Sequence, residues 1–571
     1  MGSDGEAPFH PTGGEERGPL SGFEISGEDM RRLLVGFLLA LLLVLEASSS
    51  DEREVFQQID ELALNAPAEA ESSLEDLARY LGSGARDDEE RARAIYRWIT
   101  ANIDYDVEGF TGGCVGGGWR VRTPEEVLEE RKGVCSDYAA LFSSLSEISG
   151  LDTVVIRGRG KGGGYFVGSK MPESINHAWN AVRIDGEWRL VDATWGSGHL
   201  DPGGGFVERF EEFYFFTPPE ELIWTHLPED PAWQLLDPPI SRDEFQRLVY
   251  AKPAFFNNDM KILGPEGGTI ASDDGATVSL SVPQDVRVAA HLLDGAEREL
   301  PARFAQVQWS NGGVVVRAAP PGPGEYTLRI YSRRVGQEED QERDAYDWAL
   351  DYRVVAGPNS TRERGLPVVW DAFWDMGLET ASHPEGLIDS GSELKVTLSA
   401  PGDILLLARL LDGEGRPLSE DRTLAQREEE GYTVRAAFPK PGEYALKIYA
   451  KEKGDLGGEY ASAIEYAVLA ESGSEAAGYP RTLVTFAEAG CRLIRPQEGR
   501  LPAGTPQRFE LIVPGAETVA IINDGNRTIM TRDGETFRGE VTLSAGDASL
   551  AARFPGESSY AVLLVYSVGG R

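Results

Sequence analysis

The stretch Gly133-Val134-Cys135-Ser136-Asp137-Tyr138-Ala139-Ala140-Leu141-Phe142 contains a cysteine at the point where a loop becomes a helix. Apolar residues follow at helical spacing, and Gly150 is a typical C-terminal stop. A thiol in the first turn of a helix faces unpaired backbone N–H groups and the positive end of the dipole, which both favour thiolate. An isolated cysteine here is more often a small residue that anchors a core helix. The nucleophile hypothesis for Cys135 therefore depends on residues elsewhere.

A hairpin is predicted further along the chain. Asp185-Gly186 separates two alternating runs, Asn176–Ile184 and Glu187–Trp195. Asp-Gly in this setting is the strongest short-range signal for a two-residue type I′ turn. We therefore expect Ile184 to pair with Glu187.

Counting from this turn places Asp192 opposite Trp179 and His177 opposite Thr194. Side chains alternate between faces, so His177 and Asp192 become diagonal neighbours with Cβ atoms roughly 5–8 Å apart. A carboxylate at that distance can orient an imidazole. Taken alone, each is more often a structural residue. Together with Cys135 they predict a nucleophile, a base and an orienting acid.

Three motifs around these residues resemble the Cys, His and Asp boxes of the transglutaminase-like superfamily: GVCSDYAALF, NHAW and DGEWRLVDATW. Flanking segments resemble the kyphoscoliosis-peptidase-like branch of that superfamily: Ala94–Phe110, Thr123–Cys135 and Phe213–Leu236. The resemblance covers residues 85–250 and implies a papain-like thiol chemistry. It assigns Cys135 as nucleophile, His177 as base and Asp192 as orienting acid. Some members of this branch have lost the cysteine and serve as scaffolds, whereas this sequence keeps all three residues.

Composition limits the partners that we expect. The chain has 571 residues, too many for one core, so three to five domains are expected. Its net charge of −39 argues against binding to nucleic acid and to anionic lipid surfaces. Cys114, Cys135 and Cys491 form at most one disulfide and suggest no metal site. Because CxxC, HExxH and phosphate-loop motifs are absent from the sequence, we expect no cofactor and no metal.

The N-terminal region reads as a leader. Residues 1–29 are rich in glycine and acidic residues and are expected to be disordered or not translated. In residues 30–50, two arginines, a short apolar run and small residues predict a secretory signal peptide. The run is shorter than the roughly 20 residues of a membrane span, but an uncleaved signal anchor is the alternative. We expect a secreted, periplasmic or cell-surface protein, membrane-anchored if the leader is not cleaved.

Residues 51–250 are expected to form the α+β thiol domain, starting with amphipathic helices over residues 51–104. The glycine-dense segment Phe110–Trp119 is interpreted as a flexible connector. A short helix is predicted to start at Thr123, with a proline and a capping-box glutamate after it. His226, in a stretch rich in Pro and Trp that we expect to be irregular, is interpreted as structural.

The sequence repeats beyond about residue 250. Leu293-Asp294-Gly295 returns as Leu411-Asp412-Gly413, and Gly324-Glu325-Tyr326 returns as Gly442-Glu443-Tyr444, each 118 residues later. Short alternating strands and Asp-Gly turns predict immunoglobulin-like β-sandwiches over residues 251–356 and 366–470. A fainter third copy is expected over residues 480–571, with Cys491 as a small core residue.

Two functions of different classes follow. The first is an exported cysteine-dependent acyl-transfer enzyme, a peptidase or amidase or a transglutaminase-like enzyme, that acts on protein or peptide amides. The pattern leaves hydrolysis and transfer both open. The second is a catalytically idle scaffold whose sandwiches bind extracellular proteins or cell-wall material. The three residues of the triad favour the enzyme, and the large non-catalytic half is the argument for the scaffold.

Processing of the leader is the first testable prediction. If residues 30–50 are a cleaved signal peptide, N-terminal sequencing of exported protein should begin between about Ser48 and Asp51, after the small residues that signal peptidases accept. An intact residue 1 on protein recovered from the soluble cytoplasm would contradict this prediction.

Overall fold

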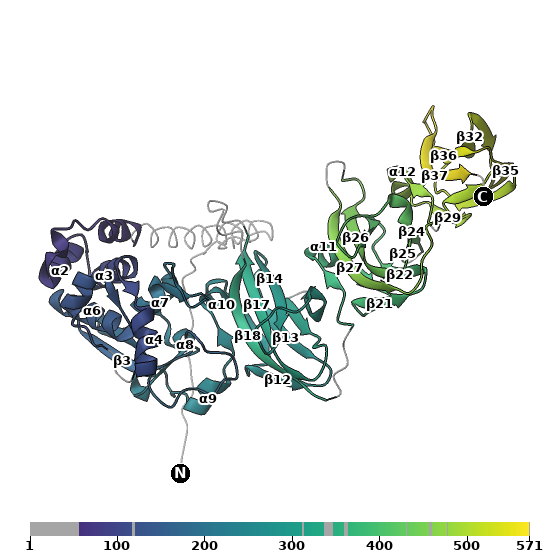
Figure 1. The fold of residues 1–571 in the computed structure, drawn as a ribbon. Helices are drawn as coiled ribbons and strands as arrows, with labels where there is room; N and C mark the ends of the chain where they lie inside the picture. Colours follow the sequence, from purple (N-terminus) through teal and green to yellow (C-terminus); the bar gives the residue numbers. More distant parts are fainter. Residues whose placement is uncertain are drawn as a thin grey trace, which may run out of the picture. The chain divides into compact units, whose positions relative to one another are not determined.

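Figure 1 shows a computed structural model, which describes most of the chain from residue 56 onward. The described residues are 56–116, 120–201, 203–310, 313–335, 346–358, 364–429, 431–455, 459–476 and 478–569. The predicted leader and the predicted disordered segment lie outside these residues. Within them, no helix is both long enough and apolar enough to cross a membrane.

The chain forms two compact units. Of the described residues, the first contains those within 56–154, 180–188 and 192–210, and the second those within 155–179, 189–191 and 211–569. One sheet has five strands in the order β8-β5-β4-β3-β9. The strands are β3 (Thr153–Gly160), β4 (His177–Ile184), β5 (Glu187–Val191), β8 (Phe215–Thr217) and β9 (His226–Pro228).

Helices dominate the first unit, as the sequence predicts. Residues 56–64 are helical, and the helices that follow are α2 (Leu74–Gly82), α3 (Asp88–Asn102), α4 (Val107–Gly116), α5 (Pro124–Glu130), α6 (Cys135–Ile148) and α7 (Ala193–Ser197). Asp87 caps α3 by accepting a hydrogen bond from the Glu90 amide. Apolar side chains of α3 and α6, such as Ile95 and Phe142, are fully buried and form the core of this unit.

Short strands complete the first unit. Strand β1 (Asp104–Tyr105) pairs in parallel with β2 (Lys132–Gly133), which immediately precedes α6. Strand β6 (Gly198–Leu200) pairs with β7 (Phe206–Glu208). The predicted capping box of α5 is confirmed, because the Thr123 hydroxyl and the Glu126 carboxylate each accept the other's backbone N–H.

Two expectations for connecting segments are wrong. The glycine-dense segment is not a connector throughout, because Val107–Gly116 forms helix α4. The segment after β8 is not irregular throughout either. It contains α8 (Pro219–Leu222), β9, a 3-10 turn η3 (Pro231–Gln234) and α9 (Arg242–Arg247). Strand β9 pairs with β3 and extends the sheet, so this segment belongs to the core.

The second unit continues into a first β-sandwich. One sheet has the order β10-β18-β17-β14, with β12 paired to β18, and the other has the order β11-β13-β16-β15. The bounds are β10 (Tyr250–Ala251), α10 (Pro253–Asn257), β11 (Lys261–Gly264), β12 (Thr269–Ser272), β13 (Ala276–Ser281), β14 (Val286–Leu293), β15 (Ala305–Ser310), β16 (Gly313–Ala318), β17 (Gly324–Arg334) and β18 (Asp347–Ala356). Alternating side chains of both sheets fill the space between them.

A second sandwich repeats this topology. Its sheets are β19-β27-β26-β23, with β21 on β27, and β20-β22-β25-β24. The bounds are β19 (Val368–Val369), α11 (Asp371–Asp375), β20 (Glu379–Thr380), β21 (Leu387–Ser390), β22 (Glu393–Ser399), β23 (Ile404–Asp412), β24 (Thr423–Glu428), β25 (Gly431–Ala437), β26 (Gly442–Glu452) and β27 (Ala461–Ala470). Helices α10 and α11 begin 118 residues apart, as do strands β17 and β26.

Residues 480–569 also form two sheets, β28-β37-β36-β32-β33 with β30 on β37, and β29-β31-β35-β34. The bounds are β28 (Arg481–Thr482), α12 (Val484–Glu488), β29 (Arg492–Arg495), β30 (Arg500–Pro502), β31 (Pro506–Ile512), β32 (Thr518–Asn523), β33 (Asn526–Ile529), β34 (Thr531–Asp533), β35 (Thr536–Thr542), β36 (Gly546–Arg553) and β37 (Ala561–Gly569). The predicted fold class, a thiol domain followed by immunoglobulin-like sandwiches, is confirmed. The exact domain boundaries stay a prediction.

A buried ion pair joins β17 to β18 in the first sandwich. Arg329 donates to both oxygens of Asp351, at 3.0 and 2.9 Å, and its guanidinium stacks on the Trp348 ring. Burial raises the pKa of Asp351 to about 6, although Arg329 acts in the opposite direction. The second sandwich has Lys447 opposite Glu465 on the matching strands, with burial raising the pKa of Glu465.

The Asp351 pair gives a stability prediction with a defined sign. A folded-state pKa of about 6 against an ordinary value of 3.8 means that the folded protein binds more protons between these pH values. Stability from this group is therefore lost as pH rises from about 4 to 6, by up to about 3 kcal/mol. Asp351→Asn should remove the loss. Urea unfolding of the isolated first sandwich at pH 4, 5, 6 and 7 measures the free energy of unfolding of the unchanged protein and of Asp351→Asn. The two values should diverge as pH rises, and a constant difference between them would contradict the prediction.

Candidate active site

Helix α6 places Cys135 where the sequence predicts it. Cys135 is the first residue of the helix, is partly exposed, and follows the N-cap residue Val134. The Asp137 carboxylate accepts the Val134 amide at 3.0 Å, which holds the loop-to-helix transition. A Cβ on Gly133 would lie 2.8 Å from the Asp137 Cβ, so this approach needs glycine. The thiol therefore sits in the first turn, at the positive end of the helix dipole.

A network of charges fixes this end of α6. The Arg122 guanidinium donates to Glu130 at 2.8 Å, to Asp106 at 2.8 Å and to Asp137 at 3.3 Å. Burial acts to raise the pKa of Asp106, but hydrogen bonds from the Gly109 amide and Arg122 outweigh it and hold that pKa below its usual range. These partners keep Asp137 in place as the cap of the helix that carries Cys135.

The predicted hairpin exists, with the predicted turn. Asp185 and Gly186 have φ of 50° and 88°, the positive pair that a type I′ turn requires. Strand β4 is buried at every position except Arg183, which explains its almost continuous apolar and aromatic run. Within the first unit, the Asn180 amide donates to the Ala139 carbonyl at 3.0 Å and thereby ties β4 to helix α6.

Asp192 has a structural role that the sequence did not indicate. Strand β5 ends at Val191, and Asp192 is the N-cap of α7, where its Oδ1 accepts the amides of Thr194 and Trp195 at 2.9 and 3.0 Å. The expectation that Thr194 pairs across the ladder with His177 is therefore wrong, because Thr194 is helical. Both capping bonds use Oδ1, so the cap does not need Oδ2.

The structure groups His177, Asp192 and His226. One ring nitrogen of each histidine and one carboxylate oxygen of Asp192 all lie within 4.8 Å of one another, and all three side chains are buried. The predicted base and orienting acid are thus neighbours. The pairing of Cys135 with His177 stays a prediction.

His226 is the residue that sequence reasoning missed. The sequence indicates only a structural role, yet the His226 ring lies 5.2 Å from the His177 ring and 5.0 Å from the Trp179 ring. The one signal that could have found it is its position at the start of a short apolar stretch, Leu227-Pro228, that forms β9.

Two imidazoles and a carboxylate are also ligands that zinc accepts. Among the described residues, the side chains of His177, Asp192 and His226 form the group that is close enough together to hold a metal ion. A metal on the His177 nitrogen that accepts the proton in catalysis would prevent His177 from acting as a base.

The other thiol of the described chain behaves differently from Cys135. Cys491 is 1% exposed in the third sandwich core, and burial raises its pKa to about 12. It therefore stays a protonated thiol at neutral pH. The prediction that Cys491 is a small core residue is confirmed. The Cys114 side chain lies outside the described part of the structure.

Comparison with known proteins places this fold in a family. The description "Transglutaminase-like superfamily" matches residues 75–193, which include Cys135, His177 and Asp192. "KY-like, immunoglobulin-like domain" matches residues 242–367 and 361–477. Kyphoscoliosis peptidase from Homo sapiens is 30% identical over 489 residues, which cover 83% of this chain and 70% of the relative. The chain belongs to the kyphoscoliosis peptidase family.

Two further relatives also match over most of this chain. Kyphoscoliosis peptidase from Mus musculus is 28% identical over 475 residues, covering 81% of this chain and 68% of its own. Lim and transglutaminase domain protein ltd-1 from Caenorhabditis elegans is 27% identical over 443 residues, covering 71% of this chain and 60% of its own. The similarity to kyphoscoliosis peptidase therefore runs through the thiol domain and into the sandwiches.

A buried lysine lies at the start of the loop that leads to His177. Lys161 is fully buried, donates its Nζ to the Leu248 carbonyl at 3.4 Å, and faces the rings of Phe245 at 4.5 Å and Tyr165 at 5.6 Å. Burial lowers the pKa of Lys161 to about 7. The ring faces return part of the hydration that the ammonium loses.

Lys161 gives a second pH prediction. Its folded-state pKa lies below the ordinary value of 10.5, so the unfolded chain binds more protons between about pH 7 and 10.5. Stability from this group therefore rises with pH across that window, by up to about 5 kcal/mol. Lys161→Met should be more stable than the unchanged chain at pH 7, with the gap closing toward pH 10. Urea unfolding at pH 7, 8.5 and 10 measures the gap, and a constant gap would contradict the prediction.

Proposed function

We propose that this chain is an exported cysteine-dependent acyl-transfer enzyme that acts on protein or peptide amides. The observation that carries the proposal is the buried imidazole–carboxylate neighbourhood of His177 and Asp192. A thiol at the first position of helix α6 and membership of a transglutaminase-like family support it. Export rests on the leader sequence alone.

In the proposed reaction, the Cys135 Sγ attacks the carbonyl carbon of an amide while its proton passes to His177. The C–N bond then breaks, and the amine leaves with the proton from His177. The acyl group remains on Cys135 as a thioester. Water or a second amine gives a proton to His177 and attacks the thioester, and the proton returns to the leaving thiolate.

Asp192 would orient His177 and stabilise the imidazolium that forms. Its capping bonds to α7 use one oxygen, so one carboxylate serves both purposes. Asp192→Asn is a sharp test for this reason: the amide oxygen can still cap α7, while the negative charge is lost. The fold should persist and the reaction should fail.

The experiment is labelling with an electrophilic peptide probe, followed by mapping of the labelled cysteine. Cys135 should be alkylated by iodoacetamide near pH 6, where an ordinary thiol of pKa about 8.5 is almost fully protonated. Cys135→Ala should abolish labelling and His177→Ala should nearly do so. Asp192→Asn should slow turnover by up to about four orders of magnitude, as the comparable change does in a serine protease triad. Cys491→Ser is the matched control and should keep the unchanged rate.

Preferential labelling of Cys114, or slow labelling that does not depend on His177, would overturn the proposal. If Cys135 does react, the acyl product formed in the presence and absence of an added primary amine separates hydrolysis from transfer. Incorporation of the amine into the peptide identifies a transferase, and release of free acid alone identifies a peptidase or amidase.

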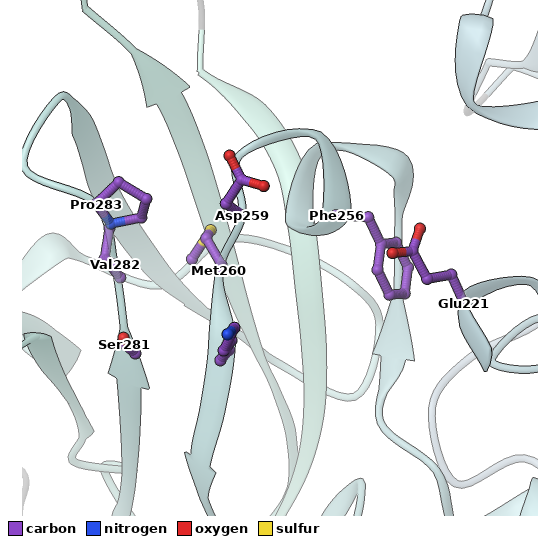
Figure 2. A pocket seen from close by; sticks show the side chains of 8 residues that line it. Glu221, Phe256, Asp259, Met260, Ser281, Val282 and Pro283 are labelled. Carbon is purple, nitrogen blue, oxygen red and sulfur yellow. The ribbon is translucent and has the colours of Figure 1, made fainter. Parts of the chain in front are cut away.

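A catalytically idle scaffold is the second candidate, and one observation favours it. A cavity of about 400 Å³ opens beside helix α10 in the second unit, and Figure 2 shows the carboxylates of Glu221 and Asp259 at it. Burial and the charges of Glu220 and Asp259 raise the pKa of Glu221. Asp259 is paired with Arg334 at 2.8 Å, whereas Glu221 has no cationic partner among the described residues. The lining residues are Glu221, Phe256, Asp259, Met260, Lys261, Ser281, Val282 and Pro283.

A basic side chain of a protein partner would complement this surface, because its charge meets Glu221 and its stem meets the apolar wall. The scaffold reading gains support if Cys135 is unreactive and a basic peptide binds the full chain but not its Glu221→Gln variant. It loses support if the peptide binds both equally.

A further inference from the structure

His226 is held in one ring orientation by its neighbour. Its Nδ1 lies 2.9 Å from the Thr225 hydroxyl oxygen. That hydroxyl also donates to the Leu222 carbonyl at 3.4 Å, so the Thr225 side chain is held beside the ring. At 1% exposure, the ring has no bulk water to rotate into.

Three rings from two strands that are not neighbours meet here. Strand β3 lies between β4 and β9 in the sheet, yet His226 on β9 reaches both His177 and Trp179 on β4. The His177 and Trp179 rings are themselves stacked, with centroids 5.8 Å apart. His226 stands nearly perpendicular to Trp179, at 77°. The imidazole of His177 is therefore bounded by two rings.

Glycines of β3 make this meeting possible. Gly160 is the ladder partner of His226 and has no side chain to stand between the rings. A Cβ on Gly158 would lie 2.5 Å from the outer edge of the Trp179 ring and 2.3 Å from the Leu227 carbonyl oxygen. Side chains from β4 and β9 can therefore lie over β3.

The backbone next to His177 and the backbone of His226 both hydrogen-bond or pair with Gly160 of β3. Asn176, which precedes His177, accepts the Gly160 amide at 2.8 Å and donates to the Gly160 carbonyl at 3.1 Å. Gly160 in turn pairs with His226. The backbone N–H of Asn176 also donates to the Gly158 carbonyl. The positions of the two histidines are thus coupled through one strand.

We infer that His226 is a positioning residue for the imidazole of His177. This inference rests on the proposed function, in which His177 is the base. The hydrogen-bonded ring of His226 fills the space beside His177 and prevents it from rotating away from its working orientation. The titratable groups beside His226 are His177 on β4, Asp192 and Tyr214, whose ring lies 6.2 Å away.

The test compares ring removal with ring replacement in the full chain. In His226→Ala the space beside His177 is empty, and alkylation of Cys135 at pH 7 should slow by tenfold or more, since misplacement by about 1 Å can cost a hundredfold. His226→Phe keeps a ring and should restore the rate to within about threefold. His291→Phe is the matched control, because His291 is a partly exposed histidine of the first sandwich that pairs with Glu299. It should match the unchanged chain.

A second readout does not depend on the thiol. Nitrogen-15 NMR of labelled histidines reports the tautomer and the apparent pKa of His177. His226→Ala should change both, while His226→Phe should leave the His177 tautomer unchanged. If His226→Ala does not fold, Thr225→Val removes the hydroxyl that fixes the ring and should change the same signals in the same direction.

The outcomes separate the two proposals. Unchanged His177 signals and an unchanged alkylation rate in folded His226→Ala, or in Thr225→Val, would overturn the positioning role. A purely structural role would lower stability and leave the rate per folded molecule as it was. If Cys135 of the unchanged chain reacts independently of His177, the proposed function fails, whereas the NMR comparison still decides whether His226 positions His177.

Discussion

The two-residue turn at Asp185-Gly186 is the constraint on which the rest of the site depends. A one-residue change in its length would reverse every side chain of one strand to the other face of the sheet. The positive φ angles of both residues are compatible with one tight turn type and one register. With that register, the first residue of β4 and the residue that follows β5 lie at the same end of the hairpin. His177 and Asp192 occupy those two places.

Local signals explain which parts of the fold could be predicted. The turn, the capping box at Thr123 and the start of α6 at Cys135 are each specified by residues within a few positions of one another. The sandwich repeat could be predicted because the same strands return 118 residues later. Even the irregularity between Ile330 and Tyr331 has its counterpart between Ile448 and Tyr449.

The misses have a common physical cause, which is competition from distant or capping interactions. His226 is placed by the pairing of strand β9 with strand β3, which is distant in the sequence. A strand of three residues has almost no periodicity by which it could be predicted. Thr194 continues an alternating pattern in the sequence. However, Asp192 caps helix α7, so the strand already ends at Val191. Helix α4 forms in a glycine-dense segment whose residues have low helix propensity. In each case the local sequence favours the wrong state.

The double use of Asp192 has a consequence for how such proteins evolve. Loss of the capping oxygen would release the first turn of α7, so folding alone is enough to retain Asp or Asn at position 192. Cys135 has no comparable duty, because the backbone of α6 is capped by Asp137 instead. Selection for a stable fold therefore preserves a capping side chain at this position, Asp or Asn, and leaves the thiol free to drift. In a lineage that stops using the reaction, the cysteine is the first of the three expected to disappear, and a surviving aspartate is no sign of a surviving enzyme.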